Sequence, residues 1–419
     1  MGATSAEWKF CGLRMWQQVV LALVLGVIVG IVGGHDVAGL KVLGTVFLKL
    51  IKMVVPPMIL FALISGITSL TQAHHFRGIA LKGTLAYLST AIMAVCVGLI
   101  LATVFEPGVG VPPPPHDPAA ATKAVTPPPS VGDFLMGLIP NNIVHALSND
   151  IYLQIVLFAI FTGVVMNNIR ADTNKVKELT QEMAHITFKM IEWIVRLAPL
   201  AVFGYIAFMV GTTGMDVIKS LMRLMVLVIA ACLLQYVFFG VLIRVFGKMS
   251  PMPFYRKMFT TQVMAFSTSS SKATLTTAMR ELQDKMGVSQ SSSNFMMPLG
   301  ACINMDGTAI YLGICAVFFS QMYGIHLGMD QYLMLVLTCT LGSIGAAGIP
   351  SGSIIFMGMV LNSIGLPVED QIAGVAMILG VDRILDMFRT TVNITGDSAI
   401  TLIIDKSEKQ LDEKLYNSR

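Results

Sequence analysis

The chain has 419 residues, of which 55% are hydrophobic and only 12% are charged, and its mean hydropathy is +0.74. Soluble domains carry about 25% charged residues, so the composition excludes an ordinary soluble protein and indicates a polytopic membrane protein. The formal net charge is a modest +4, and we expect the lipid bilayer, but no nucleic acid, among its partners.

Six apolar stretches in the first part of the chain approach the length of about 20 residues that a membrane span needs. They cover residues 16–32, 43–70, 81–105, 151–166, 191–210 and 221–246. Pro56 and Pro57 lie midway along the second stretch and are expected to kink or break it, because proline removes a backbone donor. A charged loop over residues 170–189 is expected to separate the fourth and fifth stretches.

The segment over residues 107–130 contains one run of four prolines and one of three. Such a composition cannot form a packed core, so we predict an extended, solvent-exposed linker. The six cysteines show no Cys-x-x-Cys pairing, and all but Cys11 lie in apolar stretches. They are interpreted as small buried hydrophobic residues, with no disulfide framework and no metal site of their own.

The second half contains interrupted apolar segments. Residues 252–286 include a serine-rich run at 267–271, and residues 332–363 include a glycine- and serine-rich run at 342–353. Irregular backbone at membrane depth is tolerated only where it is buried or lines a cavity, so each segment is predicted to be a re-entrant hairpin. Either run could also be a plain loop.

Each predicted hairpin is followed by one further span. The first of these spans, over residues 295–319, is broken by Asn-Met-Asp-Gly-Thr at 304–308, and the second, over residues 372–404, carries charged residues. This repetition is typical of an inverted-repeat transporter with its binding site near the membrane midplane. Eight crossings and the placement of the basic residues put both termini in the cytoplasm.

The last span carries a polar stripe. Asp382, Asp386, Arg389, Asn393 and Asp397 follow one another by 4, 3, 4 and 4 residues, which places them on one helix face. Ionisable residues at membrane depth indicate a functional site, although structural ion pairs within a bundle are the alternative. Arg389 suits a carboxylate, which its fork binds with two hydrogen bonds, and Asp386 suits an ammonium group. An anionic amino acid satisfies both.

The polar interruptions of the apolar segments offer further groups that could bind a substrate or an ion. An acid and an amide beside a glycine, at 304–308, provide oxygens for a sodium ion, whereas a simple glycine kink would leave Asp306 without an evident partner. The serine run at 267–271 offers hydroxyl and backbone N–H groups to a carboxylate. The glycine-rich tip of the second hairpin is interpreted as a gate that opens and closes.

Four motifs in this order carry a family resemblance: STSSSKATL, NMDGT, SIGAAGIPSGS and DRILDMFRTTVNITGD. They resemble those of the dicarboxylate/amino acid:cation symporters, a family that includes glutamate/aspartate and excitatory amino acid transporters. The resemblance covers essentially the whole chain. It implies an all-α polytopic membrane protein with eight transmembrane helices and two re-entrant helical hairpins, arranged as inverted repeats, that works as a homotrimer by an elevator mechanism.

The resemblance also implies a division of the chain. Residues 1–80 would hold scaffold helices 1 and 2, and residues 131–215 scaffold helices 4 and 5. Residues 81–130 would hold helix 3 of the transport domain and the proline-rich extracellular loop. Residues 216–419 would complete the transport domain with helix 6, both hairpins and helices 7 and 8.

Carried over position by position, the resemblance implies a substrate site and three sodium sites. The substrate contacts would be Ser270, Ser271, Thr308, Ile349, Ser353, Asp386, Arg389, Thr390 and Asn393. The sodium ligands would be Gly300, Asn304, Asn393 and Asp397 at one site, Ser343, Ile344 and Ala346 at a second, and Tyr87, Thr90, Asn304 and Asp306 at a third. The chain departs from archaeal members at Ser353, Cys302 and Ala91, where they have glycine, threonine and serine.

We therefore predict a transporter of the bacterial inner membrane, without enzymatic activity or cofactor, that takes up aspartate or glutamate with sodium as the coupling ion. Its closest alternative is a proton-coupled symporter of glutamate/aspartate or of C4-dicarboxylates. Asp386 favours an amino acid, because the family members that carry dicarboxylates lack this aspartate. Leu312 stands where mammalian members have a glutamate tied to proton and potassium coupling, which argues against that scheme.

Two other classes of protein place acidic residues in membrane spans. An intramembrane aspartyl protease uses two aspartates from separate spans, here Asp306 and Asp397, but re-entrant hairpins have no role in such an enzyme. A channel could use the same pore, and stoichiometric coupling of substrate and ion would distinguish a symporter from it.

Overall fold

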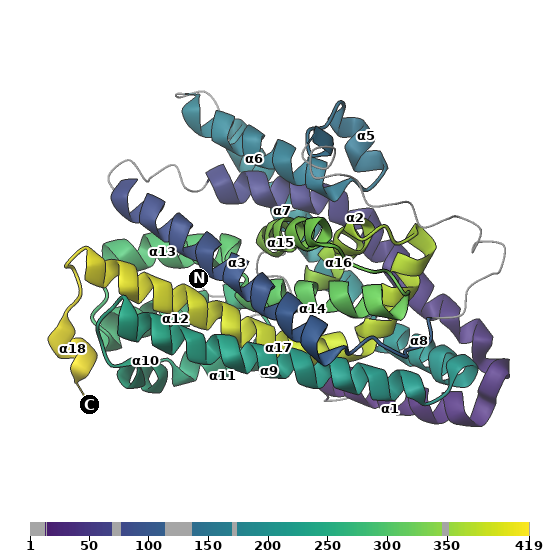
Figure 1. Ribbon diagram of the computed structural model, residues 1–419. Helices are drawn as coiled ribbons and strands as arrows, with labels where there is room; N and C mark the ends of the chain where they lie inside the picture. Colours follow the sequence, from purple (N-terminus) through teal and green to yellow (C-terminus); the bar gives the residue numbers. More distant parts are fainter. Residues whose placement is uncertain are drawn as a thin grey trace.

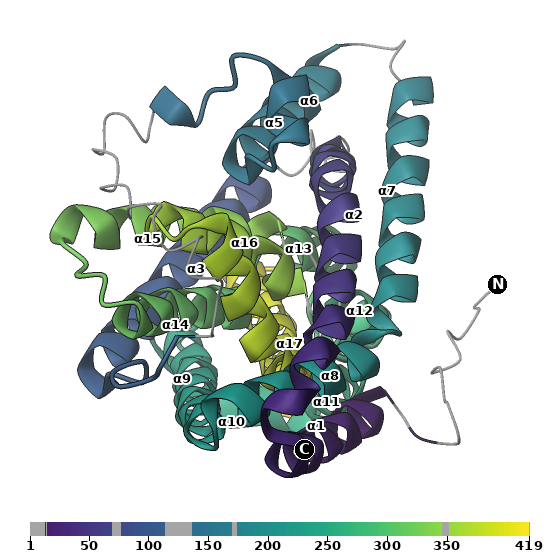
Figure 2. The same ribbon diagram turned by 90° about the vertical axis from the view of Figure 1, so that its right-hand side faces the viewer.

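The computed structural model describes Leu13 and residues 15–68, 77–113, 136–169, 174–345 and 352–418. Within these residues every regular element is helical. Figures 1 and 2 show the longest helix, α17 (Val368–Ser407, 40 residues), running through the middle of the molecule with other helices around it. This helix contains the predicted polar stripe, so the stripe lies at the centre of the fold.

Helices occupy the predicted apolar stretches of the first half. They are α1 (Met15–Gly33), α2 (Lys41–Thr68), α3 (Arg77–Phe105), α6 (Tyr152–Asn168), α8 (Ala198–Thr213) and α9 (Asp216–Val245). A 3-10 turn, η1 (Gly34–Leu40), joins the first two, and the short α5 (Ile143–Ser148) precedes α6. The predicted proline-rich linker is described only as far as residue 113, and the rest of it lies outside the described residues.

The prediction of a helix break at Pro56 and Pro57 was wrong. Both prolines lie inside α2, which continues as one helix from Lys41 to Thr68. The neighbouring Met58 and Ile59 are completely buried, so tertiary packing holds this segment helical despite the two missing N–H donors.

The predicted charged loop over residues 170–189 was also wrong. From Asn174 onward the segment is helical, as α7 (Asn174–Val195). Its buried positions Thr180, Ala184 and Thr187 recur at helical spacing, and no glycine or proline interrupts the helix. The fifth apolar stretch is consequently divided between two helices, because α7 and α8 are bent by 48° at a short break.

Two helices and a tight reversal form the first predicted hairpin. After α10 (Pro251–Lys257), the chain forms α11 (Phe259–Thr268) and α12 (Ser271–Arg280), and a π-helical turn, η3 (Glu281–Lys285), follows. Ser269 ends α11 in the left-handed conformation, with φ 52°. The serine run therefore marks the turn between the two helices, as predicted.

The break at Asn-Met-Asp-Gly-Thr is also confirmed, but it is shorter than predicted. The helices α13 (Gln290–Ile303) and α14 (Asp306–Met322) are separated only by Asn304 and Met305. In the second hairpin, α15 (Met329–Gly345) and α16 (Gly352–Ser363) flank residues 346–351, which lie outside the described residues.

The helices pack in two groups. In one, α2 packs against α6, α7 and α8, and α1 packs against α8. In the other, α3 packs against α14, α9 against α17, and both hairpins against α17. Figure 2 shows α2 and α7 on one side and α14 and α15 on the other, with α17 between them.

By length and composition, four helical stretches in the described part of the chain could cross a membrane, and the bent pair α7–α8 would be a fifth. The four are Gln17–Thr68, Leu81–Phe105, Asp216–Val245 and Gln290–Met322. The number of crossings stays a prediction. Large apolar side chains are exposed along α1 and α9, among them Val32 (83% exposed) and Val226 (61%), as expected of surfaces that face lipid.

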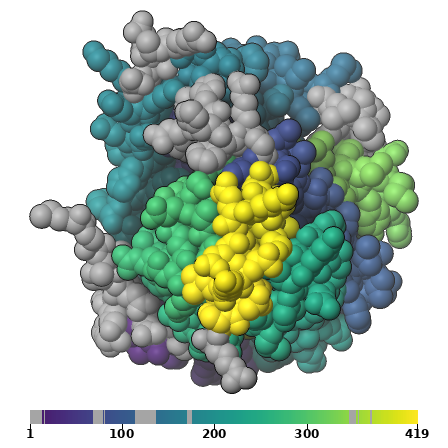
Figure 3. Space-filling view, turned by 90° about the vertical axis from the view of Figure 1, so that its left-hand side faces the viewer, coloured from purple at the N-terminus to yellow at the C-terminus, as the bar shows by residue number. Residues whose placement is uncertain are grey.

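The C-terminal residues lie on one end of the bundle, shown in yellow in Figure 3. There α18 (Glu413–Asn417) is held by Lys257, whose Nζ donates to the backbone carbonyls of Lys285, Leu415 and Tyr416 at 2.9, 2.7 and 2.9 Å. Burial raises the pKa of Tyr416 to about 12, so its hydroxyl stays protonated and donates to the carbonyl of Ser250 at 2.6 Å.

Candidate functional site

The polar stripe of α17 is buried. Asp386 is the most exposed of its five members, at 6%, and the other four, Asp382, Arg389, Asn393 and Asp397, are 3% exposed or less. On the other side of the helix, the ring of Phe388 packs edge-on against Phe266 of α11, with 5.1 Å between ring centroids. The charged residues are thus enclosed by protein, where each needs a partner.

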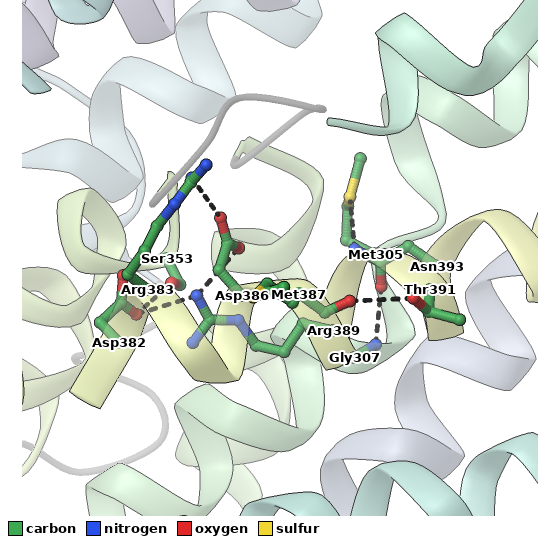
Figure 4. A network of polar contacts seen from close by, with 10 residues as sticks. All are labelled: Met305, Gly307, Ser353, Asp382, Arg383, Asp386, Met387, Arg389, Thr391 and Asn393. Atoms are coloured by element: carbon green, nitrogen blue, oxygen red, sulfur yellow. Dashed lines mark hydrogen bonds and ion pairs between the residues drawn. The ribbon is translucent and has the colours of Figure 1, made fainter. Parts of the chain in front are cut away.

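Arg389 is the centre of the first polar cluster. Its Nη2 atom donates to Asp382 Oδ1 at 2.8 Å and to Asp386 Oδ1 at 3.0 Å, and its guanidinium lies 4.1 Å from the centroid of the Tyr311 ring. Ser353 of α16 also belongs to this cluster, because its Oγ is 3.4 Å from Asp382 Oδ1. Figure 4 shows the contacts that Arg389 and Ser353 make with the two aspartates.

The guanidinium of Arg389 retains hydrogen-bonding capacity. Its Nε and Nη1 atoms are buried and have no hydrogen-bond partner among the described residues, and the same is true of Asp382 Oδ2. A buried, unsatisfied donor of a charged group is costly. Such donors are what an incoming carboxylate would satisfy, so the cluster is suited to an anionic ligand.

Asp386 lies between two arginines (Figure 4). Its Oδ1 accepts from Arg389, and its Oδ2 is 3.7 Å from Nη1 of Arg383. The two arginines stand three residues before and three residues after Asp386, so the i,i+3 spacing was a signal in the sequence that could have found the second pair.

The other predicted substrate residues fall into three sets. Thr308 on α14 and Thr390 on α17 are buried, at 5% and 4% exposure, on helices that pack together. Ser270 caps α12 by accepting from the Ala273 backbone N–H, and Ser271 is buried. Because α12 packs against α17, these serines belong to the same central region. Ile349 lies outside the described residues.

A second polar cluster forms at the break between α13 and α14. Nδ2 of Asn304 donates to Asp397 Oδ1 at 3.0 Å, and its Oδ1 accepts from Thr90 of α3 at 3.1 Å. Gly300 packs directly on this pair, since a Cβ there would lie 2.7 Å from Asp397 Oδ1. The structure thus brings together three members of the first predicted sodium site, and Thr90 and Asn304 of the third.

Tyr87 and Asp306 complete the third predicted set. The Tyr87 hydroxyl lies 3.1 Å from the backbone oxygen of Met296 and 3.3 Å from that of Asp397. Asp306 accepts from Gln235 of α9 at 3.0 Å, so it does have a partner. Gln235 was not among the predicted site residues, although an amide within an apolar span was a signal that could have identified it.

The contacts of Asn393, the remaining member of the first predicted site, are with the beginning of α14. Its Oδ1 accepts from the Gly307 backbone N–H at 2.8 Å, and its Nδ2 lies 3.2 Å from the sulfur of Met305. It therefore fastens the beginning of α14 to α17. Of the second predicted site, Ser343 and Ile344 are buried at the end of α15, and Ala346 lies outside the described residues.

Two buried carboxylate oxygens fit a cation. Asp306 Oδ1 and Asp397 Oδ2 find no hydrogen-bond partner within the described ranges. The Asn304 amide oxygen and the hydroxyls of Thr90 and Tyr87 belong to the same cluster, and hard cations such as sodium bind oxygens of this kind. The two clusters therefore offer unused donors to an anion and unused oxygens to a cation, side by side along α17.

Comparisons with known proteins agree with this combination. A family model described as "Sodium:dicarboxylate symporter family" matches residues 15–407. The C4-dicarboxylate transport protein 2 of Mesorhizobium japonicum is 31% identical over 418 residues, which cover 98% of this chain and 93% of that protein. The C4-dicarboxylate transport protein of Bacillus subtilis is 30% identical, with 94% of each chain covered, and that of Pseudomonas syringae pv. syringae is 31% identical, with 95% and 88% covered.

Proposed function

Because the chain belongs to the sodium:dicarboxylate symporter family, we propose that it takes up four-carbon dicarboxylates with sodium, and that aspartate is its preferred substrate. The family is one of membrane transporters, so the chain is a transporter and not an enzyme. Aspartate is itself a four-carbon dicarboxylate, with one added ammonium group. The choice between aspartate and a plain dicarboxylate therefore depends on what this site offers to an ammonium.

The observation that carries the proposal is the cluster of Arg389 and Asp386. The unused Nε and Nη1 donors of Arg389 would bind one carboxylate of the substrate, and Asp386, 3.0 Å from Nη2, would accept the ammonium. The remaining contacts would come from Thr308, Thr390, Asn393 and Ser353 and from the tips of the hairpins, Ser270, Ser271 and Ile349.

A plain C4-dicarboxylate is the second candidate. The names of the relatives favour it over an amino acid, since all three reported above are C4-dicarboxylate transport proteins. Glutamate, which is one carbon longer than aspartate, belongs in the same test.

Sodium coupling is supported by Asp306 Oδ1 and Asp397 Oδ2, two buried oxygens that have no hydrogen-bond partner among the described residues. In this proposal sodium ions bind with the substrate. One would lie near Gly300, Asn304, Asn393 and Asp397, and one near Tyr87, Thr90, Asn304 and Asp306. A further ion would use carbonyls of Ser343, Ile344 and Ala346. Each ion would neutralise buried negative charge and so favour substrate binding in the adjacent cluster.

The two groups of helices support an elevator mechanism. Residues 1–80 and 131–215 would form the fixed scaffold, and residues 81–130 and 216–419 the moving transport domain. We expect three copies to associate through the scaffold in a bacterial inner membrane, with both termini in the cytoplasm.

The test is uptake of radiolabelled aspartate, glutamate and succinate into proteoliposomes, with sodium and proton gradients imposed separately. We expect aspartate uptake driven by sodium, with succinate taken up less efficiently. Uptake driven by a pH gradient in sodium-free buffer would overturn sodium coupling. Uptake of succinate without aspartate would overturn the preference for the amino acid.

The matched variants are Arg389→Ala and Arg223→Ala. We expect the first to lower kcat/KM for aspartate at least about 100-fold, because a charge-assisted carboxylate contact is lost and Asp382 and Asp386 lose their shared partner. Arg223 is exposed on α9, so its variant controls for the loss of a positive charge. An unchanged KM in Arg389→Ala would contradict the assigned role.

A further inference from the structure

Arg383 is a residue of the central cluster to which the proposed function assigns no role. Its Nη1 atom lies 3.7 Å from Asp386 Oδ2, and its side chain is 13% exposed. The distance is that of an ion pair and is too long for a hydrogen bond. Arg389, on the other side of the same carboxylate, makes a hydrogen bond at 3.0 Å. Arg383 thus holds Asp386 more loosely than Arg389 does (Figure 4).

Arg383 also retains unused donors. Its Nε and Nη1 atoms are buried and have no hydrogen-bond partner in the part of the chain that the structure describes. A guanidinium in a low-dielectric site is stable only when its charge and its donors are matched. Arg383 lies beside Asp386 in the cluster, so a carboxylate of a bound acidic ligand could accept hydrogen bonds from its unused donors.

The formal charges of the cluster balance when both arginines are counted. Asp382 and Asp386 carry two negative charges, and Arg383 and Arg389 carry two positive charges. Without Arg383, Asp386 would repel a substrate that has two carboxylates and no ammonium. With Arg383 in place that repulsion is offset, whereas the ammonium of aspartate can replace the loosely held guanidinium as the partner of Asp386.

We propose that Arg383 is a specificity-determining residue, which neutralises Asp386 when the substrate has no ammonium group and so allows one site to accept both aspartate and plain C4-dicarboxylates. The inference rests on the proposed function. It accounts for a chain that has an aspartate suited to an amino acid and yet is similar to C4-dicarboxylate transport proteins.

The experiment compares Arg383→Ala and Arg383→Gln with the wild type, with Arg223→Ala as the control for charge. Uptake kinetics of aspartate and succinate are measured in proteoliposomes under the same sodium gradient. We expect kcat/KM for succinate to fall about 30-fold and that for aspartate to change less than about threefold. The glutamine variant keeps much of the side-chain volume, and thermal unfolding in detergent verifies that both variants are folded.

A second pair of variants tests the coupling between the two residues. Asp386→Ala should lose aspartate uptake and retain succinate uptake, because the ammonium loses its acceptor. In Arg383→Ala/Asp386→Ala the repelling charge is gone, so succinate uptake should recover relative to Arg383→Ala. A double-mutant cycle measures this coupling directly.

Three results would overturn the inference while the proposed function stands. They are an equal loss of both substrates in the folded Arg383 variants, no change for either substrate, and a wild type that transports aspartate but is not inhibited by succinate. A wild type that transports none of the acidic substrates would instead refute the proposed function itself.

Discussion

Gly300 shows how closely single residues determine the ion-binding region. It lies on α13, one turn before the break, and faces both Asp397 and Tyr87. Asn304, at the break, links Asp397 to Thr90 by two hydrogen bonds. The absence of a side chain at Gly300 lets the Asp397 carboxylate and the Tyr87 hydroxyl lie directly against the backbone of α13.

Gly300→Ala should therefore lower the apparent affinity for sodium. The added Cβ would lie 2.7 Å from Asp397 Oδ1 and 2.9 Å from the Tyr87 hydroxyl, so Asp397 must move. We expect the sodium concentration for half-maximal aspartate uptake to rise at least about tenfold, roughly 1.4 kcal/mol of ion binding. Uptake measured across a series of sodium concentrations tests this.

Gly66→Ala on α2 is the matched control. Its added Cβ has 3.9 Å to the nearest atom, Cys302 Sγ, and should be tolerated. If the two alanine variants showed the same sodium dependence, Asp397 would not be an ion ligand.

The helix α17 stays regular through its charged stripe, whereas the span that follows the first hairpin is broken between α13 and α14. In α17 the side chains provide the partners, as in the pairs that Arg389 makes with Asp382 and Asp386. At the break between α13 and α14, backbone groups are released from the helix, and one of them, the Gly307 N–H, binds Asn393. The two elements therefore contribute in different ways to one central site.

At the far end of α17, the short α18 depends on a lysine of another element. Lys257→Met retains the aliphatic stem but removes the ammonium that binds three backbone carbonyls. We expect a loss of about 1–3 kcal/mol in stability and faster tryptic cleavage of the C-terminal residues, with sodium-driven uptake retained. Thermal unfolding and timed proteolysis measure both effects.

Lys248→Met, at an exposed lysine just before α10, serves as the control. If the Lys257 variant were as resistant to heat and trypsin as this control, Lys257 would not hold α18 in place.

The two groups of helices contact one another at several places, chiefly where α8 packs against α17. The Tyr205 hydroxyl of α8 donates to the Ala373 carbonyl of α17 at 3.0 Å. Lys272, at the start of α12, lies 4.0 Å from the centroid of the Phe188 ring of α7. An elevator movement would have to break both contacts, so a covalent link at this boundary should stop transport.

A cysteine pair at Ile206 and Gly380 provides this link, in a background without the native cysteines. A Cβ at Gly380 would lie 3.2 Å from Ile206 Cγ1, so the two thiols would be within reach of one another. We expect oxidation to abolish uptake, to preserve substrate binding, and to be reversed by a reducing agent. Uptake and equilibrium binding are measured on the same preparation.

The control pair, Leu99 and Gly313, lies within one group, between α3 and α14. A Cβ at Gly313 would lie 3.5 Å from Leu99 Cγ, and oxidation of this pair should leave uptake intact. Undiminished uptake with a complete Ile206–Gly380 link would refute relative movement of the two groups.

Much of this molecule could be predicted from the sequence, because the relevant signals are local. Apolar length identified most long helices, and helical spacing placed Asp382, Asp386 and Arg389 on one face. The serine run and Asn304 marked real interruptions. The signal failed at residues 170–189, where charge was interpreted as a loop although the spacing of buried residues was helical.

The tertiary structure decided which groups meet across helices. Gln235 contacts Asp306, Asn393 binds the beginning of α14, and α2 continues through its two prolines. These outcomes depend on how helices distant in the sequence pack and on which buried polar groups then remain unsatisfied. The amino-acid sequence contains the periodicity of each helix, but the partners of a buried charge are determined only when the helices pack together.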